Sequence, residues 1–252
     1  MVKPNSGSRW NDVSRPNSGH SRGDPLRDRT DDRPRIEGKK TWRETDMDED
    51  YIIRDAKTLR DFYGWPHDAA IAKQVDYLHP HYQEFIRASP FVILATGGQD
   101  GFDASPRGDA PGFVAIEDER TLLLPDRRGN NRTDSLLNII SDARVALLFV
   151  IPGVNETIRV NGTAEISVRP DLLARFTANG KLPRTVLIVH VREVFFQCAK
   201  ALMRSELWDP SRHLSRSRLP SNGTILSTLT QERIDAVEFD RVAPARLRET
   251  MY

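Results

Sequence analysis

The sequence contains few of the residues that disulfide, metal-cluster or membrane chemistry requires. Cys198 is the single cysteine, which excludes an intramolecular disulfide and a cysteine-rich zinc site. No apolar run approaches the roughly 20 residues that a membrane helix needs. The first residues, MVKPNSGSRW, lack the apolar core of a secretory signal. We therefore expect a cytoplasmic protein that does not associate with membranes.

The sequence also lacks an excess of either charge. Lys and Arg total 37 against 36 Asp and Glu, so any site for an anion must be local. Hydrophobic residues make up only 38% of the chain, and they are scarce in residues 1–50. That segment is rich in Ser, Asn, Gly, Pro, Asp and Arg, which predicts a disordered tail of mixed charge. Nucleic-acid binding through this tail is the least favoured function.

The pattern over residues 51–218 predicts a mainly β domain with flanking helices (α+β). Short apolar runs recur with turn residues between them, which is typical of a small barrel or sandwich. Residues 157–166 alternate apolar and polar side chains and indicate a half-buried antiparallel strand. Strands are expected at 91–96, 102–105, 113–116, 121–124, 145–151, 157–166 and 186–191.

Helices are predicted on both sides of these strands and in the C-terminal extension. Leu59, Phe62 and Tyr63 stand at helical spacing near the start of the domain. Residues 219–252 are expected to form an extension with one helix. The predicted helices are 68–78, 80–88, 134–141, 171–178 and 230–239.

Arginine and small polar side chains gather between a strand ending at Leu124 and the helix predicted from Asp134. Unpaired N–H groups at a helix start attract phosphate, and arginine forks match phosphate oxygens. The same residues would also serve simply to cap the helix. The candidate donors are Arg127, Arg128 and Arg132, with Asn130, Asn131 and Ser135, and Arg107 from a neighbouring strand.

Several other motifs point away from common enzyme classes. No G-x-G-x-x-G follows a strand, which disfavours a Rossmann fold, and no G-x-S-x-G supplies a nucleophile elbow. Pro80 separates His79 from His81, so surface and capping roles are favoured over a metal site. His190 alternates within an apolar strand and is expected to be a barrel residue rather than a base.

Residues 58–210 resemble the pyridoxamine 5′-phosphate oxidase-related FMN-binding proteins. The order and spacing of several segments carry the resemblance. Together the segments are specific, whereas SPRGD alone would be weak. These segments are ASPFVILAT (88–96), SPRGD (105–109), TLLLPDR (121–127), GNNR (129–132), RVNG (159–162), VFFQCAKAL (194–202) and LWDP (207–210).

The resemblance implies a six-stranded antiparallel Greek-key split barrel that forms a homodimer with FMN at the interface. It assigns FMN phosphate binding to Arg107, Arg127, Asn131, Arg132 and Ser135. It implies that Ser105 and Asp126 approach the flavin ring or ribityl chain. It also implies that Gln197 and Lys200 of the second subunit contact the cofactor. Ser135 stands where a lysine is common in the family, and Arg132 is expected to supply the missing charge.

The predicted function is that of an FMN-dependent oxidoreductase acting on an unidentified small molecule. In that case the cofactor carries the electrons, so no catalytic side chain is required by the pattern. The alternative is a non-catalytic module of the same fold that binds or senses flavin or haem. Arg212 and His213 follow Trp208 without matching the oxidase signature closely, so pyridoxal phosphate synthesis is not predicted.

Overall fold

The computed structural model describes residues 51–99 and 101–252, so the tail expected at 1–50 lies outside the described residues. The chain divides into two units, one ending at Leu59 and the other spanning Arg60–Tyr252. In the first unit, Asp55 Oδ1 accepts a 2.9 Å hydrogen bond from the Thr58 N–H. This bond satisfies a donor in the first turn of α1 (Ala56–Tyr63).

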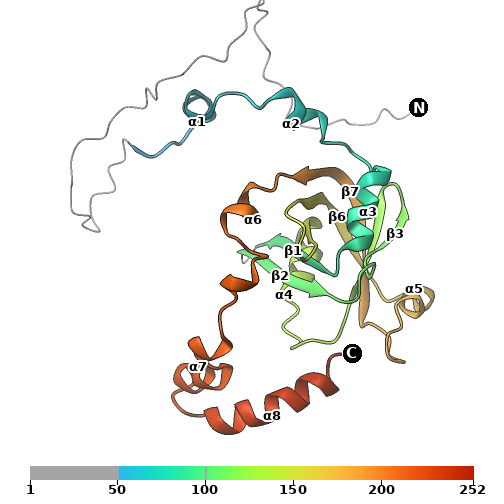
Figure 1. Ribbon diagram of the computed structural model, residues 1–252. Helices are drawn as coiled ribbons and strands as arrows, with labels where there is room; N and C mark the ends of the chain where they lie inside the picture. The colour runs from blue at the N-terminus through green and yellow to red at the C-terminus, as the bar shows by residue number, and fades with distance from the viewer. Residues whose placement is uncertain (1–50, 100) are drawn as a thin grey trace, which may run out of the picture. The chain divides into compact units, whose positions relative to one another are not determined.

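Seven antiparallel strands form one sheet in the order β2-β1-β5-β6-β7-β4-β3 (Figure 1). This arrangement confirms the mainly β fold with flanking helices. The pattern analysis predicted seven strands, whereas the resemblance implied six. The observed count among the described residues is seven, because short β3 adds an edge strand beside β4. The strands are β1 (Phe91–Gly98), β2 (Gly101–Gly108), β3 (Ala115–Asp118), β4 (Thr121–Asp126), β5 (Arg144–Val150), β6 (Thr157–Ser167) and β7 (Thr185–Gln197).

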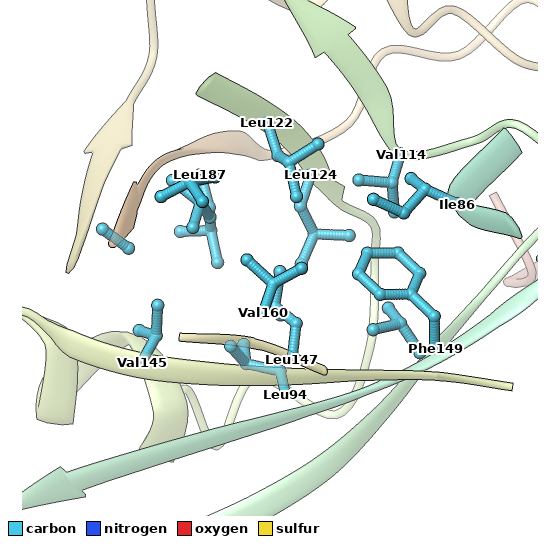
Figure 2. Close-up of a cluster of buried hydrophobic side chains, with 14 of the residues drawn as sticks. Ile86, Leu94, Val114, Leu122, Leu124, Val145, Leu147, Phe149, Val160 and Leu187 are labelled. Carbon is cyan, nitrogen blue, oxygen red and sulfur yellow. The ribbon is translucent and has the colours of Figure 1, made fainter. Parts of the chain in front are cut away.

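The sheet curls so that strands far apart in its order approach one another. β2 is an edge strand and β4 lies five positions away, yet Arg107 Nε on β2 donates to Asp126 Oδ1 on β4 at 3.1 Å. One apolar cluster also joins side chains from β1, β5, β6, β7 and β4. Figure 2 shows Leu147 and Val160 pointing toward Leu122, Leu124 and Leu187 across this interior. The inner faces of the curled sheet therefore enclose the main core.

A close strand contact interrupts the pairing of β6 with β7 near the middle of β6. The register between β6 and β7 shifts between Asn161 and Gly162. A Cβ atom at Gly162 would lie 2.1 Å from the His190 carbonyl oxygen, so no larger residue fits without a backbone shift. The β-bulge thus depends on glycine, and it adds twist where the sheet closes on its core.

The shorter helices follow the predicted pattern with two differences in length. The helix expected at 68–78 is α2 (Asp68–Ala72), because Val75 leaves it to form a bridge with Val194 on β7. α3 (Pro80–Ala88) matches its predicted bounds, and His79 Nδ1 accepts a 3.3 Å hydrogen bond from the His81 N–H. The capping role predicted for His79 is therefore confirmed. The second difference is α5 (Pro170–Arg175), which ends before residue 178, the predicted end. The others are α4 (Asp134–Ser141), α6 (Lys200–Arg204) and two 3-10 turns, Pro210–Arg212 and Arg216–Arg218.

α4 packs closely on the β1–β2 hairpin. Asn138 Nδ2 donates to Thr96 Oγ1 at 3.1 Å, and Ile139 enters the main core. A Cβ atom at Gly98 would lie 2.3 Å from Asn138 Oδ1, so the glycine lets the helix approach the strand end. The first turn of α4 is consequently held beside β2.

The C-terminal extension contains two helices where one was predicted. α7 (Asn222–Leu229) is capped by Ser221, and α8 (Ala236–Glu249) is capped by Asp235. The predicted helix 230–239 spans the turn between them, where Gln231 has a φ of 52° and breaks helical geometry. Within the described part of the chain, no helix has the length and apolar character to cross a membrane.

Candidate functional site

The alternation of β2 sends three polar side chains to the inner side of the sheet. Ser105 pairs with Leu94 and Arg107 with Val92, and both partners on β1 are fully buried. Directly opposed residues share a face of the sheet. Asp103 follows the same period, so the three polar side chains continue the core-facing side at its edge.

Arg107 is the centre of a polar cluster. Its Nε donates to Asp126 Oδ1 at 3.1 Å, and its two terminal nitrogens reach Ser105 Oγ at 2.9 Å and Ser135 Oγ at 3.4 Å. Only 19% of the arginine side chain and 17% of the aspartate side chain are exposed. We call Asp103, Ser105, Arg107, Asp126 and Ser135 the Arg107 cluster.

Ser135 joins this cluster to the first turn of α4. Its side chain is buried, and its Oγ donates to Asp103 Oδ2 at 2.5 Å. The oxygen also lies 2.8 Å from Ser105 Oγ. Thr133, the residue that precedes the helix, has a φ of 58° and makes no side-chain cap. The amide groups of the first helical turn therefore lack the usual side-chain partner beside this cluster.

The charged form of Asp126 is poorly stabilised, although its carboxylate pairs with Arg107. Burial raises the pKa of Asp126, and the opposing effect of Arg107 does not fully offset it. The negative charge is therefore costly at this position. A second anion placed on Arg107 would raise the pKa of this carboxyl further.

Arg127 lies in a second cluster, although it follows Asp126 in the sequence. Its Nε donates to Asp109 Oδ2 at 2.5 Å, and one terminal nitrogen donates to the Phe176 carbonyl oxygen at 2.9 Å. Tyr252 donates from its hydroxyl to Asp109 Oδ1 at 2.9 Å, and its ring lies 5.1 Å from the Arg127 guanidinium carbon. We call Asp109, Arg127, Phe176 and Tyr252 the Arg127 cluster.

Asp109 is better satisfied than Asp126. Burial acts to raise its pKa, but the Ala110 N–H, the Tyr252 hydroxyl and Arg127 together lower the pKa below its ordinary value. The hydrogen bond to Asp109 in turn raises the pKa of Tyr252. Three donors therefore hold the Asp109 carboxylate in its charged form.

The loop between β4 and α4 points its remaining candidates to solvent. Asn130 Oδ1 accepts from the Arg132 N–H at 3.1 Å, and Asn131 has a φ of 60°. Arg132 Nε donates to Asp134 Oδ2 at 2.8 Å, with 74% of the arginine side chain exposed. These predicted phosphate ligands lie on the approach to α4, outside the Arg107 cluster.

Gln197 and Lys200 lie at the opposite end of β7 from the Arg107 cluster. Asp126 pairs with Thr185 at the first residue of β7, whereas Gln197 is the last. At about 3.3 Å per residue, the 13-residue strand spans roughly 40 Å. Measured along this strand, Gln197, and Lys200 beyond it, therefore lie far from Asp126.

Two of the three acidic members of these clusters, Asp103 and Asp109, were missing from the sequence prediction. The period-2 pattern through Ser105 and Arg107 also contains Asp103, and extending that strand by its period would have identified it. Asp109 follows the strand within the SPRGD segment, but its partners Arg127 and Tyr252 are distant in sequence. No local pattern indicates that contact.

Comparisons with solved structures found several chains that are similar to part of this one. HupZ from Group A Streptococcus shares 20% identity over 47% of this chain and 92% of that chain, with a TM-score of 0.39. A putative pyridoxamine 5′-phosphate oxidase from Lactobacillus delbrueckii shares 22% over 48% and 95%, with a TM-score of 0.39. A structure titled F420 reductase shares 20% over 47% and 98%, with a TM-score of 0.34.

The comparison with protein families concerns the barrel itself. No curated protein matches the sequence. Residues 78–198 match the family model described as pyridoxamine 5′-phosphate oxidase. This span contains all seven strands and both Arg107 and Arg127. The domain formed by residues 78–198 is therefore of the pyridoxamine 5′-phosphate oxidase-related family.

Proposed function

We propose that the protein binds FMN and acts as an FMN-dependent oxidoreductase on a small molecule. The observation that carries the proposal is the Arg107 cluster within the family domain. It places an arginine fork and two hydroxyl groups beside the start of α4. These are the donor types that bind a phosphate monoester.

The donor set fits a phosphate, but the two carboxylates of the cluster compete with it. Asp126 holds the Nε side of the Arg107 fork, and Asp103 accepts from Ser135. A phosphate that binds here either replaces Asp126 as the partner of the Arg107 guanidinium or requires Asp126 to be protonated. The raised pKa of Asp126 lowers the cost of protonation. The serines can redirect their hydroxyl protons by simple rotation.

When bound, FMN supplies the redox chemistry of the proposed reaction. The residues of this chain bind and orient it. Arg107 neutralises phosphate charge, Ser105 and Ser135 donate hydrogen bonds, and the first turn of α4 offers its amides. Arg132 is exposed and adds a weaker, screened attraction from the approaching loop.

We also propose that two copies associate and share two FMN sites. Support comes from an apolar, partly exposed outer face on the β1–β2–β5 layer. The register aligns Ile93 with both Pro106 and Leu148, and Ala95 with both Ala104 and Ala146. Exposed apolar area of this kind is typical of protein interfaces. In this dimer, Gln197 and Lys200 of each copy would reach the Arg107 cluster of the other copy.

Absorption spectroscopy during FMN titration tests the cofactor assignment. We expect the flavin bands of added FMN to shift on binding and its fluorescence to change with one equivalent per chain. Light scattering on the same sample is expected to report a dimer. Reduction of the bound flavin by a nicotinamide donor, followed by reoxidation by a substrate, separates an oxidoreductase from a non-catalytic module. Protein that leaves the FMN spectrum and fluorescence unchanged would falsify the proposal.

A further inference from the structure

A cavity of about 470 Å³ lies beside the Arg127 cluster. The connection from β2 to β3 forms one wall, and the C-terminal end of α5 forms another. Arg127, Arg175 and Phe176 line it together with Asp109. Such a space combines a planar aromatic wall, cationic forks and a hydrogen-bond acceptor.

Tyr252 contacts two of the polar groups that line this cavity, Arg127 and Asp109, from outside the family domain. Its ring stacks over the Arg127 guanidinium at 5.1 Å, and its hydroxyl donates to Asp109 at 2.9 Å. The tyrosine thus uses both properties of its side chain, the ring face and the O–H donor. A free molecule with the same two properties would satisfy the same partners.

The segment that carries Tyr252 is lightly attached to the barrel. None of the α8 residues is buried, and Pro244 interrupts its hydrogen-bonding pattern. Lys181 Nζ contacts the Glu249 carbonyl oxygen at 3.5 Å, which is a long hydrogen bond. Lifting Tyr252 away therefore exposes little apolar surface.

We propose that Tyr252 is a lid on a binding site for a planar ring that carries an O–H or N–H donor. In the closed state, Tyr252 occupies the positions that the ring and the donor of this ligand take. Ligand entry moves Tyr252 outward, and the ligand then stacks on Arg127 and donates to Asp109. The inference is independent of FMN binding, because it concerns a different cluster and a segment beyond residue 198.

The side chain of tyrosine itself provides the probe. p-Cresol reproduces the ring and hydroxyl of Tyr252, and toluene reproduces the ring alone. Calorimetric or NMR titration of the full chain is carried out with wild type, Tyr252→Ala and Tyr252→Phe. In wild type, p-cresol must compete with an intramolecular ring whose effective concentration is on the order of millimolar.

We expect Tyr252→Ala to bind p-cresol about tenfold more tightly than wild type does, because the competitor is gone. In this variant, p-cresol is expected to bind more tightly than toluene, since only p-cresol donates to Asp109. Tyr252→Phe is expected to lie between the other two proteins, because it retains stacking and loses the donor. Equal p-cresol affinity in wild type and Tyr252→Ala would overturn the proposal, as would equal affinity of Tyr252→Ala for p-cresol and toluene. These outcomes leave FMN titration untouched, so the lid and the cofactor site fail separately.

Discussion

The Arg107 and Arg127 clusters each contain an arginine–aspartate ion pair, but the two aspartates differ in how many hydrogen bonds they accept. Each joins one arginine to one largely buried aspartate. Asp109 accepts from three donors and has a lowered pKa, whereas Asp126 has Arg107 as its charged partner and a raised pKa. Asp126 loses more of its hydration than Asp109 and has fewer donors, and these two differences together give the opposite directions of the two pKa shifts. The Arg107 cluster thus has an arginine that can exchange partners.

The largest expected effect comes from removing that arginine. Arg107→Ala should weaken FMN binding by about tenfold to a hundredfold, since a charge-assisted hydrogen bond contributes roughly 1.5–3 kcal/mol. Arg132→Ala should cause a smaller, salt-sensitive loss, because its side chain is 74% exposed. Arg144→Ala, which removes an exposed arginine paired with Asp142, is the control. FMN titration by fluorescence measures all three, and equal affinities across them would refute the phosphate assignment.

The next effect concerns stability and the Arg127 cluster. Asp109→Asn should lower the free energy of unfolding at pH 7 by about 1–2 kcal/mol, because Arg127 loses a charged partner. Since the folded pKa of Asp109 is lowered, its stabilisation is complete above the unfolded value. This stabilisation is lost as the pH falls through the pKa of Asp109 in the folded protein. Urea unfolding at pH 7 and in acid measures this, and a difference between wild type and variant that stays constant with pH would contradict it.

The smallest effect is an improvement at the Arg107 cluster. Asp126→Asn should tighten FMN binding about fivefold at pH 7, equivalent to roughly 1 kcal/mol, because an anion next to the phosphate is removed. Since the folded pKa of Asp126 is raised, its charge costs stability as pH rises through that value. The FMN affinity of the wild type should therefore decline as pH rises through this pKa, whereas the FMN affinity of Asp126→Asn should not show this decline. Weaker binding by Asp126→Asn would show that the carboxylate helps to orient the arginine.

The sequence predicted elements whose signals are local. α3 and α4 match their expected bounds, because Pro80 and Asp134 stand at helix starts and apolar residues follow at helical spacing. The β strands follow from alternation and from turn residues. The extension was misread, since its two caps, Ser221 and Asp235, lie on either side of the predicted helix.

Local sequence patterns could not predict the contacts of the site that form only because the sheet curls. Arg107 and Ser135 were named from the sequence, but their contact requires α4 to pack on β2. Asp109 meets Tyr252 across 143 positions, and no periodicity links them. Periodicity reports which face of an element is buried, whereas closure of a sheet is a property of all its strands together.

The length of β7 gives the proposed dimer a genetic consequence. One end of this strand lies beside Arg107's partner Asp126, and the other carries Gln197. Each shared site then takes its phosphate ligands from one copy and its Gln197 end from the other. A copy lacking Arg107 and a copy lacking Gln197 are each defective at both sites when paired with themselves. Paired with each other, they place both lesions in one site and leave the second intact, so the mixed dimer is expected to keep one of its two FMN sites.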